Sequence, residues 1–174
     1  MNPIIKNGNG ITQRFDNVEN LGEDGMSSQI LDFYPTFWKV RIRAITRQNE
    51  KYLSVHMDYE GANKNQQNWR CEVWDTLKLL NMRNYDDDWD ELDDEQAVHE
   101  NYTQPGSICV TYNSDKYDWG YERVYLWSKL QPDGFMRNGS IMVQIAFSYK
   151  YWYYPYPAPT RAQLTNDAEN APNR

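Results

Sequence analysis

The chain has 174 residues, of which 25 are acidic and 18 basic, so its formal net charge is −7. One domain of this length can bury roughly two-thirds of its unfolded surface, and seven Trp, fourteen Tyr and five Phe supply large core side chains. Nine of the acids, and no Lys or Arg, fall between Asp86 and Glu100. The remaining 16 acids and 18 bases nearly balance, so we expect no wide basic face for nucleic acid.

Membrane and export signals are missing from the sequence. No apolar run approaches the roughly 18 residues of a membrane span, and the opening segment, MNPIIKNGNG, has no apolar core of a signal peptide. Cys71 and Cys109 are too few for a disulfide framework and are typical of buried thiols in a reducing compartment. We therefore expect a cytoplasmic or nuclear protein without a membrane partner.

The first part of the chain predicts short strands. Residues 1–10 are polar and suggest a flexible lead-in. A first strand and turn are indicated by three spaced apolar residues, Phe15, Val18 and Leu21. A second short strand over 30–34 ends at Pro35, which cannot donate to a ladder.

Clear alternation begins at Trp38. Apolar residues there alternate with cations, in the order Trp38, Lys39, Val40, Arg41, Ile42 and Arg43. A helix would scatter these cations around its circumference, so the period of two predicts a strand. The next run repeats the pattern, with Leu53, Val55, Met57 and Tyr59 on one face and Tyr52, Ser54, His56 and Asp58 on the other.

A third alternating run contains one carboxylate on its apolar face. Cys71, Val73, Leu77 and Leu79 share that face with Asp75. A lone inward carboxylate is costly unless it is paired. Either a bulge turns Asp75 outward, or a buried partner receives it. We expect the bulge.

The acidic block follows Asn81 and ends before a turn at Pro105-Gly106. Its Asp86, Asp88 and Asp90 match the first spacings of a calcium-binding EF-hand loop. However, Glu91 stands where that loop needs Gly, and Ala97 stands where it needs Glu. We therefore expect a solvated loop, with docking of a basic partner at 86–100 as the sharper alternative.

The last part of the chain continues the strand pattern. A strand over 108–112 leads to the corner Asp118-Trp119-Gly120-Tyr121. A final strand places Ile141, Val143, Ile145, Phe147 and Tyr149 on one face and Met142, Gln144, Ala146 and Ser148 on the other. Several strands separated by turn signals, with no long helical period, predict an antiparallel sandwich.

Catalytic motifs are not found. His56 falls in a strand and His99 in the acidic loop, and neither has a nucleophile or metal-ligand spacing beside it. We expect no catalytic residues, no metal and no cofactor. At the Asp118–Tyr121 corner, the residues alone leave two alternatives open. Its aromatics could be core or turn residues, with Gly120 supplying an unusual backbone angle, or they could contact a partner.

The order of several short motifs resembles a known family. Phe37-Trp38-Lys39-Val40, Tyr52-Leu53-Ser54-Val55, Trp69-Arg70-Cys71, Leu79-Leu80-Asn81, the Asp118-Trp119-Gly120-Tyr121 corner and Trp127-Ser128-Lys129-Leu130 follow one another as in MATH domains, the TRAF-like family. The resemblance covers about residues 11–149. It implies an all-β antiparallel β-sandwich of about seven to eight strands, with an acidic loop at about 84–106. Residues 150–174 would form an aromatic, Pro-rich segment and a linker.

The resemblance also implies a site. In MATH domains the corner faces a shallow groove across one sheet, where an extended peptide of a partner protein lies. Carried over, the peptide contacts fall on Asp118, Trp119, Tyr121 and the backbone of Gly120. His56 takes the position of another groove aromatic, which would make binding sensitive to pH.

Departures from the family pattern concern the charge around this groove. Tyr117 and Glu122 flank the corner where degron-reading members tend to carry Lys, and Asp75 occupies a groove position that can hold an aromatic. A ligand with a basic or aromatic side chain therefore fits better than a phosphorylated one. The resemblance implies a substrate-recognition module in ubiquitin-related machinery, as a ligase adaptor or in a deubiquitinase, or a TRAF-type signalling trimer.

Two other classes of function remain as alternatives. A structural module could join a larger assembly through the acidic loop and the aromatic tail. A carbohydrate-active jelly-roll would need two carboxylates that face each other across a cleft, and acids clustered in one loop do not provide them. The oligomeric state is not indicated by the sequence.

Overall fold

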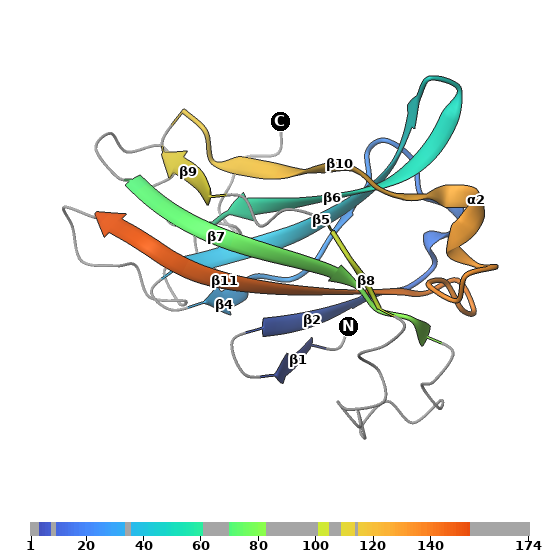
Figure 1. Cartoon of the computed structure of the whole chain (residues 1–174), viewed down its shortest axis with the longest axis horizontal. Coiled ribbons are helices and arrows are strands. Elements are labelled where there is room, and N and C mark those ends of the chain that lie inside the picture. The colour runs from blue at the N-terminus through green and yellow to red at the C-terminus, as the bar shows by residue number, and fades with distance from the viewer. Residues whose placement is uncertain are drawn as a thin grey trace, which may run out of the picture.

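The chain folds as two antiparallel β-sheets packed face to face, as Figure 1 shows. The computed structural model describes residues 4–7, 10–33, 36–60, 70–82, 101–104, 109–113 and 115–153. The expected all-β antiparallel sandwich is confirmed. The acidic block and the segment after Tyr153 lie outside the described residues.

One sheet has six strands, in the order β1-β2-β11-β7-β8, with β9 also paired to β7. The strands are β1 (Ile4–Asn7), β2 (Gly10–Phe15), β7 (Arg70–Leu79), β8 (Tyr102–Thr103), β9 (Cys109–Asn113) and β11 (Ile141–Tyr153). The long pairing of β7 with β11 forms its centre (Figure 1). β11 continues past Tyr149, where we expected the domain to end.

The second sheet has five strands, in the order β10-β6-β5-β3, with β4 also paired to β5. They are β3 (Met26–Ser27), β4 (Leu31–Phe33), β5 (Thr36–Arg47), β6 (Glu50–Tyr59) and β10 (Asp118–Leu126). A two-residue turn, Gln48-Asn49, joins β5 to β6, and both residues have positive φ. Such a turn matches the right-handed twist of the two strands.

The core lies between the two sheets, and the strand alternation decides which side chains enter it. On β5, Trp38, Val40 and Ile42 are buried, whereas Lys39 and Arg41 are half-exposed. The Trp38 ring packs edge-to-face against Tyr59 and Tyr112, at centroid distances of 5.4 and 4.7 Å. These contacts join strands of both sheets, so the period of two read from the sequence corresponds to the core face.

Short helical turns close one end of the sandwich. The 3₁₀ turn η1 (Val18–Asn20) follows β2, and the helix α2 (Trp127–Leu130) follows β10. The chain then turns at Gly134, whose φ is positive, and the backbone N–H of Phe135 donates to the carbonyl of Leu130 at 2.7 Å. Leu130 and Phe135 are buried, so this end is anchored in the core.

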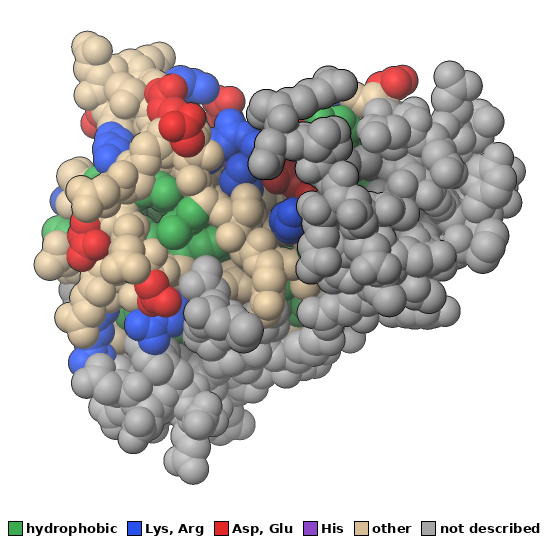
Figure 2. Space-filling model, turned by 180° about the vertical axis from the view of Figure 1, so that it is seen from behind, with side chains coloured by type: hydrophobic (Ala, Val, Ile, Leu, Met, Phe, Trp, Pro, Cys, Tyr) green, Lys and Arg blue, Asp and Glu red, His purple; other side chains and the backbone are tan. Residues whose placement is uncertain are grey.

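Most large hydrophobic residues in the described part of the chain are buried in the core or packed against it. Tyr117 is the large hydrophobic residue that stands out, with 44% of its surface exposed. On the side of the molecule opposite to Figure 1, hydrophobic side chains gather between acidic and basic ones (Figure 2). Among the described residues, no helix is long and apolar enough to span a membrane.

Candidate functional site

The Asp118–Tyr121 corner begins β10, at the edge of the five-stranded sheet. Its residues pair with β6 in register: Asp118 with Asp58, Trp119 with Met57, Gly120 with His56, and Tyr121 with Val55. Because side chains alternate along a strand, the corner presents two residues to each face of the sheet. The structure thus divides the residues that we predicted to contact a peptide.

Trp119 and Tyr121 are on the inner face. Their partners on β6, Met57 and Val55, belong to the buried core. Tyr121 is only 9% exposed, while Trp119 is half-buried and packs against the core. Trp119 therefore exposes more of its surface than Tyr121 does, and the Lys116 ammonium lies 4.2 Å from the centroid of the Trp119 ring.

Asp75 is buried, and the predicted bulge that would turn it outward is wrong. β7 keeps its alternation, and Asp75 has no exposed surface. The other alternative applies, because the hydroxyl of Tyr121 donates to Asp75 Oδ1 at 3.3 Å. Burial raises the pKa of Asp75, and this hydrogen bond lowers it in part. Asp75 has no surface that faces solvent. The peptide contact that we predicted for it would therefore require the peptide to reach the interior of the sandwich.

Three buried side-chain polar atoms on β7, β9 and β10 have no hydrogen-bond partner among the described residues. They are Asp75 Oδ2, Tyr112 Oη and Trp119 Nε1. Burial raises the pKa of Tyr112, and the neighbouring Asp75 carboxylate raises it further. The three atoms come from β7, β9 and β10, and these strands belong to both sheets.

His56 and Gly120 are neighbours on the outer face of the same sheet. An added Cβ at Gly120 would meet the His56 ring at 2.5 Å and would also overlap the carbonyl oxygen of Val55. The His56 ring therefore uses the space that Gly120 leaves open. Its Nε2 lies 2.8 Å from the hydroxyl of Ser54.

Charge around His56 favours its neutral form. Burial is the largest cause that lowers the pKa of His56, and Arg43 and Arg41 lower it further. Arg41 forms ion pairs with Asp58 at 2.9 Å and with Asp118 at 3.5 Å. The outer face beside the corner is thus polar and cross-linked between strands, instead of the aromatic surface that a hydrophobic groove would need.

Tyr117, which we predicted to bind the peptide, and Glu122, which also flanks the corner, are exposed. Tyr117 precedes β10, and its backbone carbonyl accepts a hydrogen bond from the N–H of Tyr59 at 2.8 Å. Glu122 pairs with Arg47, with Nε–Oε2 and Nη2–Oε1 distances of 3.3 Å. Arg47 lowers the pKa of Glu122. Glu122 thus already has a cationic partner.

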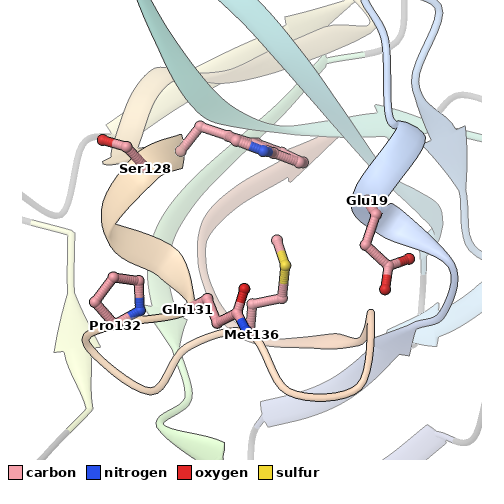
Figure 3. A pocket seen from close by; sticks show the side chains of 6 residues that line it. Glu19, Ser128, Gln131, Pro132 and Met136 are labelled. Carbon is pink, nitrogen blue, oxygen red and sulfur yellow. The ribbon is translucent and has the colours of Figure 1, made fainter.

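A separate hollow of about 580 Å³ lies at the α2 end of the sandwich, lined by Glu19, Trp127, Ser128, Gln131, Pro132 and Met136. Glu19 faces it from η1, opposite Ser128 and Pro132 on the α2 side, as Figure 3 shows. The Lys51 ammonium already covers the Trp127 ring, 4.3 Å from its centroid. The hollow combines apolar and polar groups without a converging set of reactive side chains.

The described part of the chain contains neither a metal-binding group of side chains nor a reactive cysteine. It contains no group of three or more His, Cys, Asp or Glu residues that could hold a metal ion. Cys71 is buried, and burial raises the pKa of its thiol to about 12. Such a thiol is inert as a nucleophile at neutral pH.

The fold and the corner define the class: an antiparallel β-sandwich whose longest edge strand carries a polar-aromatic site. A family model for the MATH domain matches residues 15–147, and the chain belongs to this family. A search of curated proteins gives no match. MATH domains are generally protein-interaction modules and not enzymes, so a general role in binding other proteins follows.

Some site residues were not predicted from the sequence. Tyr112 was predicted only as the end of a strand, and its place opposite Cys71 depends on how β9 pairs with β7. The Arg41–Asp118 ion pair joins residues 77 positions apart. Alternation indicated the face of each residue, but no local signal specified which strands would be neighbours.

Proposed function

We propose that this domain binds an extended segment of a partner protein alongside β10. The observation that carries the proposal is the length of this edge strand. β10 has nine residues, whereas the other edge strands β1, β3, β4, β8 and β9 have two to five. Edge strands are usually kept short or blocked because their free backbone groups pair with other chains. A long edge strand suits recognition by strand addition.

Side chains around β10 would provide specificity. Trp119 offers a partly exposed aromatic surface, and Tyr117 an exposed one. Asp118 is about half-exposed, and its carboxylate can accept hydrogen bonds beyond its 3.5 Å contact with Arg41. His56 adds a neutral imidazole beside it, in the space that Gly120 leaves open. This set favours a peptide with polar and aromatic or basic side chains.

An N-methyl scan of a bound peptide tests the strand-addition geometry. The peptide would be selected on an array of partner-derived sequences, and each backbone N–H would be methylated in turn. In an added strand only every second N–H faces the edge. We expect binding to fall at alternate positions, by about tenfold for a lost hydrogen bond of about 1.4 kcal/mol. Uniform tolerance of methylation would exclude strand addition.

The cellular role that we propose is substrate recognition in ubiquitin-related machinery, in the cytoplasm or nucleus. Family membership supports this role. A pull-down with the domain, followed by mass spectrometry, tests it. Partners whose ubiquitylation changes when the domain is removed would support the role. Partners unaffected in ubiquitylation and turnover would contradict it.

A scaffolding role through the acidic loop 86–100 and the segment 150–174 is the second candidate. Most of both segments lies outside the described residues. Replacing residues 86–100 by a short Gly/Ser loop separates the two functions. Peptide binding alongside β10 should survive the replacement, and its salt dependence should weaken because screened long-range attraction comes from the removed charges. Loss of partner binding with an intact fold would favour the scaffolding role.

A further inference from the structure

The hollow at the α2 end lies where β10 ends. Trp127, the first residue of α2, lines the hollow and follows directly on Leu126, the last residue of β10. Four of the lining residues are exposed: Glu19, Ser128, Gln131 and Pro132. The hollow is therefore open to solvent, and its volume of about 580 Å³ lies within the range of ligand pockets. A peptide strand alongside β10 that continues past Leu126 leaves the sheet at this end of the sandwich.

Glu19 is the charged residue of the lining. It belongs to η1, which is attached to the turn at Asn138-Gly139 because the backbone N–H of Val18 donates to the carbonyl of Gly139 at 2.9 Å. An added Cβ at Gly139 would overlap both carboxylate oxygens of Glu19. The glycine thus leaves the space that the carboxylate occupies. Figure 3 shows Glu19 facing the α2 side of the hollow.

The Glu19 carboxylate has no cationic partner in the described part of the chain. None of the ion pairs found there involves Glu19, and it makes no hydrogen bond to a described residue. The other residues that line the hollow are neutral. The fold therefore holds one negative charge at the opening, in a place where a cation from outside can reach it.

The remainder of the lining suits an aliphatic chain. Met136 is its buried member, with 9% of its surface exposed, and it packs against the core. Its backbone N–H donates to the carbonyl of Leu130 at 2.9 Å, which fixes its position. Trp127 and Pro132 add further apolar surface. Lysine and arginine combine an apolar stem with a charged end, so their shape and charge match this lining.

We propose that the hollow between η1 and α2 binds a lysine or arginine side chain, from the part of the bound peptide that continues past the α2 end of β10. The stem of this side chain packs on Met136 and Trp127, and its cation pairs with Glu19. The proposal rests on the proposed peptide binding alongside β10, to which it adds a second contact. It names the residue class that the peptide carries beyond its paired segment.

Other side chains suit the hollow less well. An acidic or phosphorylated residue would be repelled by Glu19. A leucine would fill the apolar part, but it would displace water from the carboxylate without replacing its hydrogen bonds. The Lys51 ammonium, 4.3 Å from the centroid of the Trp127 ring, opposes a second cation in part. Because Glu19 is also exposed, we expect a preference of about fivefold for lysine over leucine.

Extended peptides test this preference. A peptide selected on the array is lengthened at each end in turn by a Gly-Ser spacer and one variable residue, Lys, Arg, Leu or Glu. At the end that lies near α2, Lys or Arg should bind about fivefold more tightly than Leu. Glu19→Gln should remove this preference, and Glu19→Lys should reverse it in favour of Glu. Glu23→Gln is the matched control, because it removes an exposed carboxylate outside the hollow and should keep the preference.

The outcomes separate the hollow from the binding alongside β10. Peptides that bind without a Lys or Arg preference at either end would overturn the hollow alone. A preference that persists in Glu19→Gln would overturn it as well, because the cation would then pair elsewhere.

A second measurement does not depend on peptide binding. n-Butylammonium has the stem and charge of a lysine side chain, whereas n-butanol has a similar stem without the charge. We expect n-butylammonium to shift the carboxyl ¹³C signal of Glu19 and the methyl signal of Met136, and n-butanol to leave the Glu19 signal unchanged. If no array peptide binds, the proposed function is contradicted, but these shifts would still support the hollow as a cation site. In that case, unchanged Glu19 and Met136 signals would overturn the hollow too.

Discussion

Tyr121 on β10 donates a hydrogen bond to Asp75 on β7, with 3.3 Å between the hydroxyl and Oδ1. The two residues belong to different sheets, so this contact is a polar link across an otherwise apolar interior. Desolvation raises the pKa of both side chains. The link therefore contributes to stability, because it gives the buried Asp75 a hydrogen-bond donor.

Removal of the Tyr121 hydroxyl should destabilise the domain. Tyr121→Phe leaves the buried Asp75 without its side-chain donor, at a cost of about 1–3 kcal/mol in the free energy of unfolding. Urea denaturation measures this cost. Tyr52→Phe is the control, because it removes an exposed hydroxyl that bonds Glu50 Oε2 at 2.6 Å and should cost little. Equal losses in the two variants would show that burial of the Asp75 contact has no special weight.

Asp75 should make the domain less stable as pH rises. Its folded-state pKa is raised above the usual value of 3.8, so the folded state holds its proton more tightly than the unfolded state. The resulting stability is fully present below pH 3.8 and is lost as pH rises through the folded pKa. Melting temperatures of wild type and Asp75→Asn should diverge over this window, with wild type falling relative to the variant. Asp58 has a raised pKa too, but it is present in both proteins, so parallel curves would refute the assignment to Asp75.

His56 should have the opposite effect. Burial and the cations Arg43 and Arg41 lower its folded pKa below 6.5, against smaller opposing effects of Asp118 and Glu122. The unfolded state then binds the proton more readily, so the stability that neutral His56 provides is present above pH 6.5 and is lost as pH falls through the folded pKa. His56→Gln should flatten this part of the stability profile in thermal melts. A variant with the same acid-side loss as wild type would assign that loss to other groups.

Gly120 should not tolerate a side chain. An added methyl would overlap the carbonyl oxygen of Val55 and push on the His56 ring, so Gly120→Ala should cost about 1–3 kcal/mol through overpacking. Gly22→Ala is the matched control, because no atom lies within 4 Å of its added Cβ. Melting temperature measures both. If Gly120→Ala were as stable as Gly22→Ala, β10 and β6 would have to be farther apart than described.

Trp119 should contribute to stability and to binding. It is half-buried against the core, so Trp119→Ala should cost about 2 kcal/mol of stability, less than for a fully buried Trp. As an aromatic anchor it should also carry about 2 kcal/mol of peptide affinity, roughly 30-fold. Affinity of the folded fraction, measured beside the melting temperature, separates the two effects. Unchanged affinity with reduced stability would assign Trp119 to the core alone.

Local patterns predicted several of the strands and their inner faces, but not β1 (Ile4–Asn7), which lies in the segment expected to be a flexible lead-in. On β5 and β6 each apolar residue from Trp38 to Ile42 and from Leu53 to Tyr59 is buried, as the period of two predicted. Alternation determines a face because successive side chains of any strand point to opposite sides. The family resemblance likewise extended over almost the same residues as the matched MATH domain, 15–147.

Tertiary structure alone decided the position of Asp75 and the composition of the site. The sequence placed Asp75 on an apolar face, and burial cost favoured a bulge, because the compensating donor, Tyr121, is 46 residues away in the chain. The pairing of Gly120 with His56 and of Tyr112 with Cys71 likewise depends on the register between distant strands. The sequence by itself therefore determined which face of each strand is buried. The contacts between strands were decided by strand order and register in the two sheets, because hydrogen-bonded ladders bring together residues that no local pattern relates.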